Sequence, residues 1–256
     1  MNSSQKQKTQ AHHAQIVHRH QEKTNNTGEQ LSEIILGGQD GLVNTLGVIL
    51  GLAAASSDFR IVVAGGLAGA IAEAVSMGAV GYTSKVAERD FYLSELKREQ
   101  REIEEMPQEE IQEIRDIYEK KGFRGDLLEE VVKVVTSDHQ VWLDTMMQEE
   151  LKLSPVEDGQ PLKSAVLIGF SAFFGSVIPL LPFLGFYLLG IKGDGSVLNA
   201  ILIALGCSAL TLFMVGVVKS RLTVGTWYKS GLQMLVIGIV SALVGYLIGM
   251  AFSVQV

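Results

Sequence analysis

Long apolar stretches alternate with polar ones along most of the chain. Each holds about 20 residues or more, the length an α-helix needs to cross the roughly 30 Å hydrocarbon layer of a membrane. The five stretches cover residues 34–55, 61–84, 164–191, 196–218 and 231–252. The pattern therefore predicts an all-α, polytopic membrane protein with five transmembrane helices.

Composition supports the same class. Of the 256 residues, 47% are hydrophobic and only 19% are charged, which is too apolar for an ordinary soluble domain. The single cysteine, Cys207, lies in the fourth apolar stretch, so no intramolecular disulfide or thiolate cluster is expected.

Charge in the polar stretches predicts the orientation of the chain. The tail is basic and contains no apolar segment followed by a cleavage site, so we expect it to be disordered and cytoplasmic. Alternation then places the long insert inside as well, between the second and third transmembrane helices. The expected regions are a tail over 1–30, transmembrane helices 1 and 2 over 31–87, the insert over 88–158, and transmembrane helices 3 to 5 over 159–256.

The insert over residues 88–158 is strongly acidic. It holds 21 of the 28 acidic residues and 10 of the 21 basic ones, so its net charge is −11. A folded module with this charge repels nucleic acid and anionic lipid and concentrates cations. We therefore expect cations as its partners and no binding of nucleic acid.

The same insert is predicted to form three helices. Apolar residues punctuate a charged run over residues 88–106, and this first helix can simply extend the second transmembrane helix. Pro107 suits the first turn of a second helix over residues 108–120. Gly122 marks a turn, and a third helix follows over residues 126–152. Together the three predict a small cytoplasmic bundle.

Candidate ligands recur at helical spacing in these three helices. Residues three or four apart share a helix face, so the packed helices can bring six side chains together. Carboxylate oxygens bind hard divalent ions, and a thioether favours transition metals such as iron(II) or manganese(II). The alternative is a solvated face, because helices rich in Glu and Lys produce this spacing without binding metal. The six residues are Glu99, Glu102, Glu110, Glu113, Met146 and Glu150.

Two further acids lie within apolar stretches, Asp40 in the first and Glu73 in the second. An ionisable side chain in hydrocarbon costs a few kcal/mol, so it usually faces a polar pathway, a partner or a bound ion. Met77 follows Glu73 by one helical turn and shares its face. Metal and proton would compete for these carboxylates, as an antiporter requires. Alternatively, the acids are neutral and hydrogen-bonded between helices, and Met77 is ordinary packing.

A set of residues in the first two apolar stretches forms a further pattern, namely Asp40-Gly41, Glu73, Met77-Gly78 and Tyr82. Together with the spaced glutamates of the insert, the pattern resembles the vacuolar iron transporter family. The resemblance covers nearly the whole chain from about residue 31. The third apolar stretch also has the Gly-Ser-x-x-Pro-Leu-x-Pro pattern typical of that family, from Gly175 to Pro182.

This resemblance implies a homodimer that exports cytosolic ferrous iron, and often manganese, in exchange for protons. Both metals would be substrates, with no catalytic cofactor. The membrane would be vacuolar in a eukaryote and the plasma membrane in a bacterium. The insert ligands of the family fall on the six residues named above, and its pathway residues fall on Asp40, Glu73 and Met77.

Two other classes compete with a transporter. A membrane-anchored di-iron oxidase would use Glu-x-x-His pairs, but no histidine of this chain follows a glutamate at that spacing. A non-transporting metal sensor or scaffold would bind metal in the insert and would not need Asp40 and Glu73 in the membrane. The sequence therefore favours a transporter over an enzyme.

Overall fold

The structure is a computed structural model that describes residues 3–56, 58–191, 193, 195–222 and 225–252. Side chains are described from residue 27 onward, except at Leu222. The described chain forms two compact units. The membrane unit comprises Met1–Gly81 and Leu162–Val256, and the acidic unit comprises Tyr82–Pro161.

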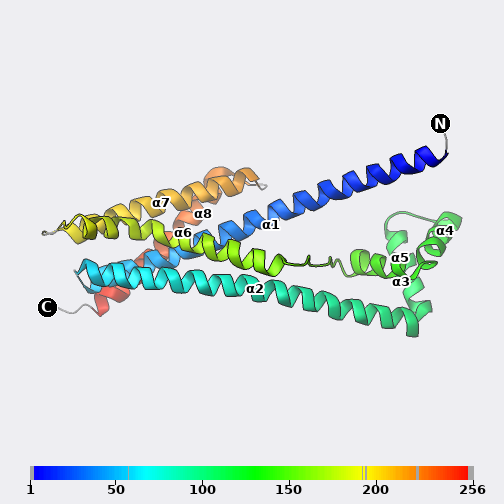
Figure 1. Cartoon of the computed structure of the whole chain (residues 1–256), viewed down its shortest axis with the longest axis horizontal. Helices are drawn as coiled ribbons and strands as arrows, with labels where there is room; N and C mark the ends of the chain where they lie inside the picture. Colours follow the sequence, from blue (N-terminus) through cyan, green and yellow to red (C-terminus); the bar gives the residue numbers. More distant parts are fainter. Residues whose placement is uncertain (1–2, 57, 192, 194, 223–224, 253–256) are drawn as a thin grey trace. The chain divides into compact units, whose positions relative to one another are not determined.

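The described residues form helices and no strand (Figure 1). Five helices are long and apolar enough to cross a membrane. They are α1, α2, α6, α7 and α8. The predicted all-α class with five candidate transmembrane helices is therefore confirmed. The elements are α1 (Ser3–Ala55), α2 (Phe59–Glu105), α3 (Pro107–Lys120), α4 (Gly125–Thr136), α5 (His139–Thr145), the π-helical turn η1 (Met146–Glu150), α6 (Gln160–Leu188), α7 (Ser196–Leu222) and α8 (Trp227–Ala251).

The apolar part of α1 that is long enough to cross a membrane is Thr27–Ala55. Helix α1 itself begins at Ser3, but the side chains before Thr27 lie outside the described residues. The disorder expected for the 1–30 tail and its cytoplasmic location stay predictions.

Glycines let the helices of the membrane unit approach closely. Helix α1 packs against α7 and α8, which also pack against each other. A Cβ atom on Gly245 would clash with the carbonyl oxygen of Gly47, and one on Gly249 would clash with that of Gly51. The Gly-x-x-x-Gly spacing on both α1 and α8 therefore serves the close packing of their backbones.

Helix α6 contacts α1 beside Asp40. The Ser176 hydroxyl donates a hydrogen bond to the carbonyl oxygen of Gly41 at 3.0 Å. A Cβ atom on Gly175 would clash with the backbone of Gly38. The first two residues of the Gly-Ser-x-x-Pro-Leu-x-Pro pattern therefore hold α6 against the turn of α1 that carries Asp40.

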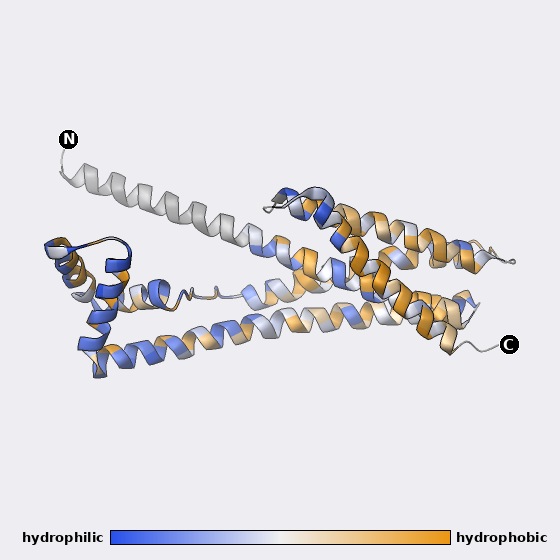
Figure 2. Cartoon of the chain, turned by 180° about the vertical axis from the view of Figure 1, so that it is seen from behind, coloured by the Kyte–Doolittle hydropathy of each residue, from blue (hydrophilic) through white to orange (hydrophobic). Residues whose placement is uncertain are grey.

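Helix α2 runs from the membrane unit into the acidic unit, and Figure 2 shows its residues changing from hydrophobic to hydrophilic along its length. The first insert helix is thus an extension of the second transmembrane helix, as the sequence suggested. Pro107 stands at the start of α3, where its missing N–H leaves no partner unsatisfied. Gly122 lies in the turn before α4, and Gly125 is the first residue of α4. They adopt positive φ values of 102° and 59°, which favour glycine.

The acidic unit has its own hydrophobic core, drawn from α2 to η1. Burial of this apolar surface holds the helices together. The buried members are Ile103, Ile114, Leu128, Val132, Val135, Trp142, Leu143, Met146 and Met147.

The single helix predicted over residues 126–152 is wrong. The chain instead forms α4, α5 and the turn η1. The Asp138 side chain accepts hydrogen bonds from the backbone N–H groups of Gln140 and Val141, at 2.9 and 3.1 Å, and so caps the start of α5. The acidic unit therefore has one more helix than predicted, and a π-helical turn at its end.

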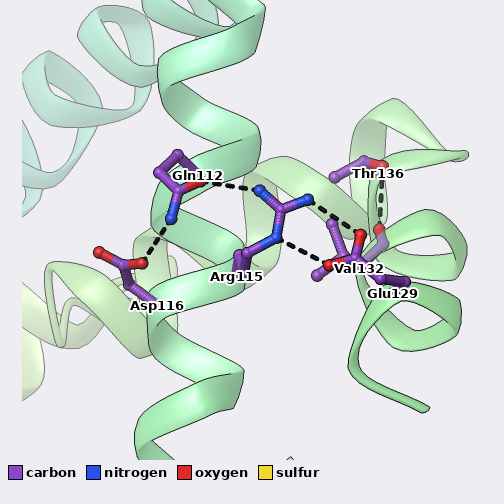
Figure 3. Close-up of polar contacts among 6 residues, drawn as sticks. All are labelled: Gln112, Arg115, Asp116, Glu129, Val132 and Thr136. Carbon is purple, nitrogen blue, oxygen red and sulfur yellow. Dashed lines mark hydrogen bonds and ion pairs between the residues drawn. The ribbon is translucent and has the colours of Figure 1, made fainter. Parts of the chain in front are cut away.

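Polar contacts join α3 to α4 on the surface of the acidic unit (Figure 3). Arg115 donates through Nε and Nη2 to the two carboxylate oxygens of Glu129, at 3.1 and 2.9 Å. This bidentate ion pair lowers the pKa of Glu129. Glu129 is thus an acid whose charge is balanced by a neighbouring base at the surface.

Candidate functional site

Five of the six predicted insert ligands form one group, which we call the carboxylate cluster. Its members are Glu99 and Glu102 from α2, Glu110 and Glu113 from α3, and Glu150 from η1. Since only Met106 separates α2 from α3, the last turns of one helix and the first turn of the other are neighbours in the chain. The cluster therefore combines four glutamates that are close in sequence with Glu150 from later in the acidic unit.

Three members of the carboxylate cluster lie close enough to share one cation. Ligand oxygens of Glu99, Glu102 and Glu110 all lie within 4.8 Å of one another. Metal–oxygen bonds are about 2.0–2.6 Å long, so two oxygens on opposite sides of an ion are about 4–5 Å apart. The spacing of these carboxylates is therefore compatible with a single divalent ion between them.

The remaining members extend this group. Glu110 lies within hydrogen-bonding reach of Glu99, and Glu150 lies within reach of Glu113. A hydrogen bond between two carboxyl groups requires a proton on one of them. Each of these contacts can therefore form a hydrogen bond only while one of its two carboxyl groups is protonated.

The pKa values of the cluster agree with this conclusion. Burial, followed by the charges of Glu113, Glu99 and Glu102, raises the pKa of Glu110 to about 7. Desolvation and then the hydrogen bond and charge of Glu113 raise the pKa of Glu150 to about 8, although part of this residue remains exposed. A bound cation favours the charged carboxylates, so metal binding would displace these protons.

Burial also distinguishes the carboxylate cluster from a solvated helix face. Glu99 is 1% exposed and Glu110 is 4% exposed, and the Oε2 atom of each is buried without a hydrogen-bond partner. A buried carboxylate oxygen without a partner is costly. These two oxygens therefore differ from those of a solvated helix face, where water would satisfy them.

The sixth predicted ligand, Met146, is completely buried in the hydrophobic core of the acidic unit, on η1 with Glu150. Its sulfur contributes to that core, and its role as a ligand stays a prediction. The π-helical hydrogen bond from the Leu151 N–H to the Met146 carbonyl, at 3.2 Å, widens the helix at this point. Such single π-turns occur frequently at functional sites.

Arg98 is a residue of the site that the sequence reasoning missed. Its guanidinium lies beside Glu95, Glu99 and Glu102. The available signal was its position next to Glu99 and one helical turn before Glu102, which places it at the edge of the same helix face.

The membrane unit contains the second candidate site. Glu73 of α2 accepts a hydrogen bond from the Asn44 side-chain amide of α1 at 3.1 Å, and Asp40 lies within hydrogen-bonding reach of the same carboxyl. Glu73 and Asp40 are both half-buried. The two acids predicted from separate helices are thus neighbours. Met77 is also half-buried, one turn after Glu73, and its role in the pathway stays a prediction.

Asn44 was not predicted as a site residue. It follows Asp40 by four residues, so both lie on one face of α1. A polar amide within an apolar stretch was the signal that could have identified it.

Comparisons with known proteins place this chain in a family. The VIT family model matches residues 31–250. The chain is 34% identical to vacuolar iron transporter 1 of Oryza sativa subsp. japonica over 93% of this chain and 90% of that protein. It is 33% identical to vacuolar iron transporter 1 of Arabidopsis thaliana, covering 89% and 88%, and 31% identical to the vacuolar iron transporter of Plasmodium falciparum, covering 92% and 86%. The chain therefore belongs to the VIT family, the vacuolar iron transporters that its motifs resemble.

Proposed function

We propose that this protein moves ferrous iron, with manganese as a second substrate, out of the cytosol in exchange for protons. The names of the relatives support iron as the substrate. The observation that supports it most strongly is that one chain contains two carboxylate sites, one in the acidic unit and one at membrane depth.

The carboxylate cluster captures the metal. Its raised pKa values mean that Glu110 and Glu150 exchange protons near neutral pH, where an arriving cation can replace them. Glu99, Glu102 and Glu113 complete the oxygen ligands, and Met146 adds sulfur to favour iron(II) and manganese(II) over magnesium. The acidic surroundings raise the local concentration of cations.

Asp40 and Glu73 bind metal and protons in turn along the pathway through the membrane. Met77 lies on the same face of α2 as Glu73. In the empty state a proton is shared between the acids, and a divalent ion replaces it. Each acid therefore alternates between a proton and a metal, as antiport requires.

The positive-inside rule supports a cytoplasmic N-terminus and a cytoplasmic acidic unit, so metal is captured from the cytosol. A second copy of the chain would cover the exposed Asn44 and the half-buried acids at membrane depth, which supports a homodimer. The host membrane is vacuolar or plasma membrane. No catalytic residue is assigned.

Flux through proteoliposomes tests the proposal. Vesicles that contain the full chain should accumulate iron(II) when a proton gradient is imposed, and Glu73→Gln should reduce the flux to that of empty vesicles. Glu104→Gln, an exposed acid on the distant part of α2, is the matched control and should leave the flux unchanged.

A sensor or scaffold would bind metal but give no iron(II) flux, either as the native chain or as Glu73→Gln. Flux that persists at the normal rate in Glu73→Gln would also contradict the pathway proposed here.

A further inference from the structure

The Arg98 guanidinium is held beside the carboxylate cluster by a residue outside it. Its Nη2 atom lies 2.9 Å from Glu95 Oε2, which is a short ion pair. The same nitrogen lies 3.7 Å from Glu99 Oε2, and Nε lies 3.7 Å from Glu102 Oε2. Arg98 is thus anchored to Glu95 and faces two members of the cluster at a longer distance.

The longer contacts attract without forming hydrogen bonds. A separation of 3.7 Å exceeds the normal limit for N–H···O bonds, and both Arg98 Nε and Glu99 Oε2 are buried without a hydrogen-bond partner. The charge of Arg98 nevertheless attracts both carboxylates across this distance. The guanidinium therefore balances charge at the cluster while the ligand oxygens remain available.

The charge of two cluster members is thus balanced by a base on the same helix. Glu99 and Glu102 lie next to the guanidinium of Arg98. Arg98 is covalently part of α2, so its charge stays near any divalent ion that the cluster binds. Repulsion between the two cations then lowers the affinity for metal.

We propose that Arg98 is the internal counter-ion of the empty carboxylate cluster and limits its affinity for divalent metal, an inference that rests on the proposed binding of metal by this cluster. When metal binds, the guanidinium moves away from Glu99 and Glu102 and stays attached to Glu95. The Arg98 side chain is 41% exposed, which leaves room for this movement. Arg98 positions charge and is not itself a ligand. A cluster that binds too tightly would not release its substrate, so a moderating cation suits a transporter.

Calorimetric titration of the full chain in detergent with Mn²⁺, against a magnesium background, tests this role. Arg98→Gln should raise the affinity about tenfold, because the repulsion between two partly screened cations is lost. Arg98→Lys keeps the charge and should stay within about twofold of the native value. Arg89→Gln is the matched control on the same helix, because Arg89 pairs with Asp90 at 3.3 Å and touches no member of the cluster.

The variants separate a counter-ion from a structural residue. If Arg98 merely positioned the glutamates, Arg98→Gln would weaken Mn²⁺ binding, and that result would overturn the inference. An unchanged affinity in Arg98→Gln would also overturn the inference, although the proposed metal site would remain. Absence of Mn²⁺ binding in the native chain and in every variant would overturn both the metal site and the role of Arg98.

Discussion

The carboxylate cluster of the acidic unit and the acid pair of the membrane unit place the same chemical group in different surroundings. In the cluster, three carboxyl groups lie close together, two more lie near them, and Arg98 lies beside two of the five. In the membrane, Glu73 has Asp40 and the neutral amide of Asn44 as neighbours. The cluster therefore has a base beside its carboxyl groups, and the membrane site has a neutral amide.

This difference teaches what each site is suited to do. Affinity for a hard cation grows with the number of charged oxygen ligands, so the cluster suits capture from a dilute solution. A site along a pathway must bind strongly enough to admit the ion and weakly enough to release it. Two acids with a neutral neighbour meet that requirement better than five acids do.

The largest expected effect comes from removing a buried member of the cluster. Glu110→Gln should lower the affinity for Mn²⁺ by about tenfold to a hundredfold, since loss of even an outer-shell partner commonly costs that much. Flux at saturating metal should fall far less, because Asp40 and Glu73 are untouched. Calorimetry and proteoliposome flux on the same preparation measure both quantities.

The neighbouring Glu109→Gln is the control for that change, since Glu109 is exposed in the first turn of α3. An equal loss of affinity in both variants would mean that the overall charge of the acidic unit, rather than a defined cluster, attracts the metal.

The pH dependence of metal binding sharpens the comparison next. Glu110 and Glu150 have pKa values of about 7 and about 8, so metal must displace protons from them below these values. Affinity for Mn²⁺ should rise by about tenfold per pH unit for each proton released, between pH 6 and pH 8. Proton release during titration in a weakly buffered solution measures this directly, and its absence at pH 6.5 would contradict the protonated cluster.

The same pKa shifts determine how folding stability depends on pH in the absence of metal. Folding raises the pKa of Glu110 from its ordinary value of 4.5 to about 7, so the stabilisation is complete below 4.5 and is lost as the pH rises through 7. Glu150 has a pKa of about 8, so its contribution to folding stability is lost as the pH rises through about 8. Hydrogen exchange in α3 should therefore become faster from pH 5 to pH 8 relative to the intrinsic rate, and excess Mn²⁺ should reverse the trend.

Much of this arrangement could be predicted from helical spacing. Apolar length gave the five transmembrane helices, and the three-residue spacing of glutamates placed Glu99 with Glu102 on one face. Spacing within a helix cannot report which faces of different helices meet. Asp40 and Glu73 were predicted to share a pathway, but spacing alone could not show that they are neighbours, and Asn44 as a partner of Glu73 was missed.

The break between α4 and α5 was missed for a related reason. Apolar residues continue at helical spacing on both sides of Asp138, so the hydrophobic pattern alone predicts one helix. The capping hydrogen bonds of Asp138 decide the local conformation, and the only signal for them was the polar run Thr136-Ser137-Asp138. The π-helical turn η1 has no comparable signal in the sequence.

A smaller effect is expected at the amide that distinguishes the membrane site. Asn44→Leu removes the hydrogen bond to Glu73, and hydrogen bonds to charged groups contribute about 1.5–3 kcal/mol. Iron(II) flux should fall about tenfold if that energy is needed when Glu73 is charged. Affinity of the carboxylate cluster for Mn²⁺ should stay unchanged. Gln233→Leu, an exposed polar residue of α8, is the control, and an equal loss of flux in both would indicate a general effect on the membrane helices.

The smallest effect concerns the cap that orients one side of the cluster. Asp138→Ala removes the two hydrogen bonds at the start of α5 and should destabilise that helix by about 1 kcal/mol. Hydrogen exchange in α5 should become about fivefold faster, and Asp138→Asn, which can still cap, should restore most of the protection. Glu130→Ala on the exposed face of α4 serves as the control. Because α5 leads directly into η1, a loosened α5 should weaken Mn²⁺ binding through Glu150 while leaving membrane flux at saturating metal unchanged. If Mn²⁺ affinity did not respond at all, Glu150 would be dispensable, and the cluster would consist of the glutamates of α2 and α3 alone.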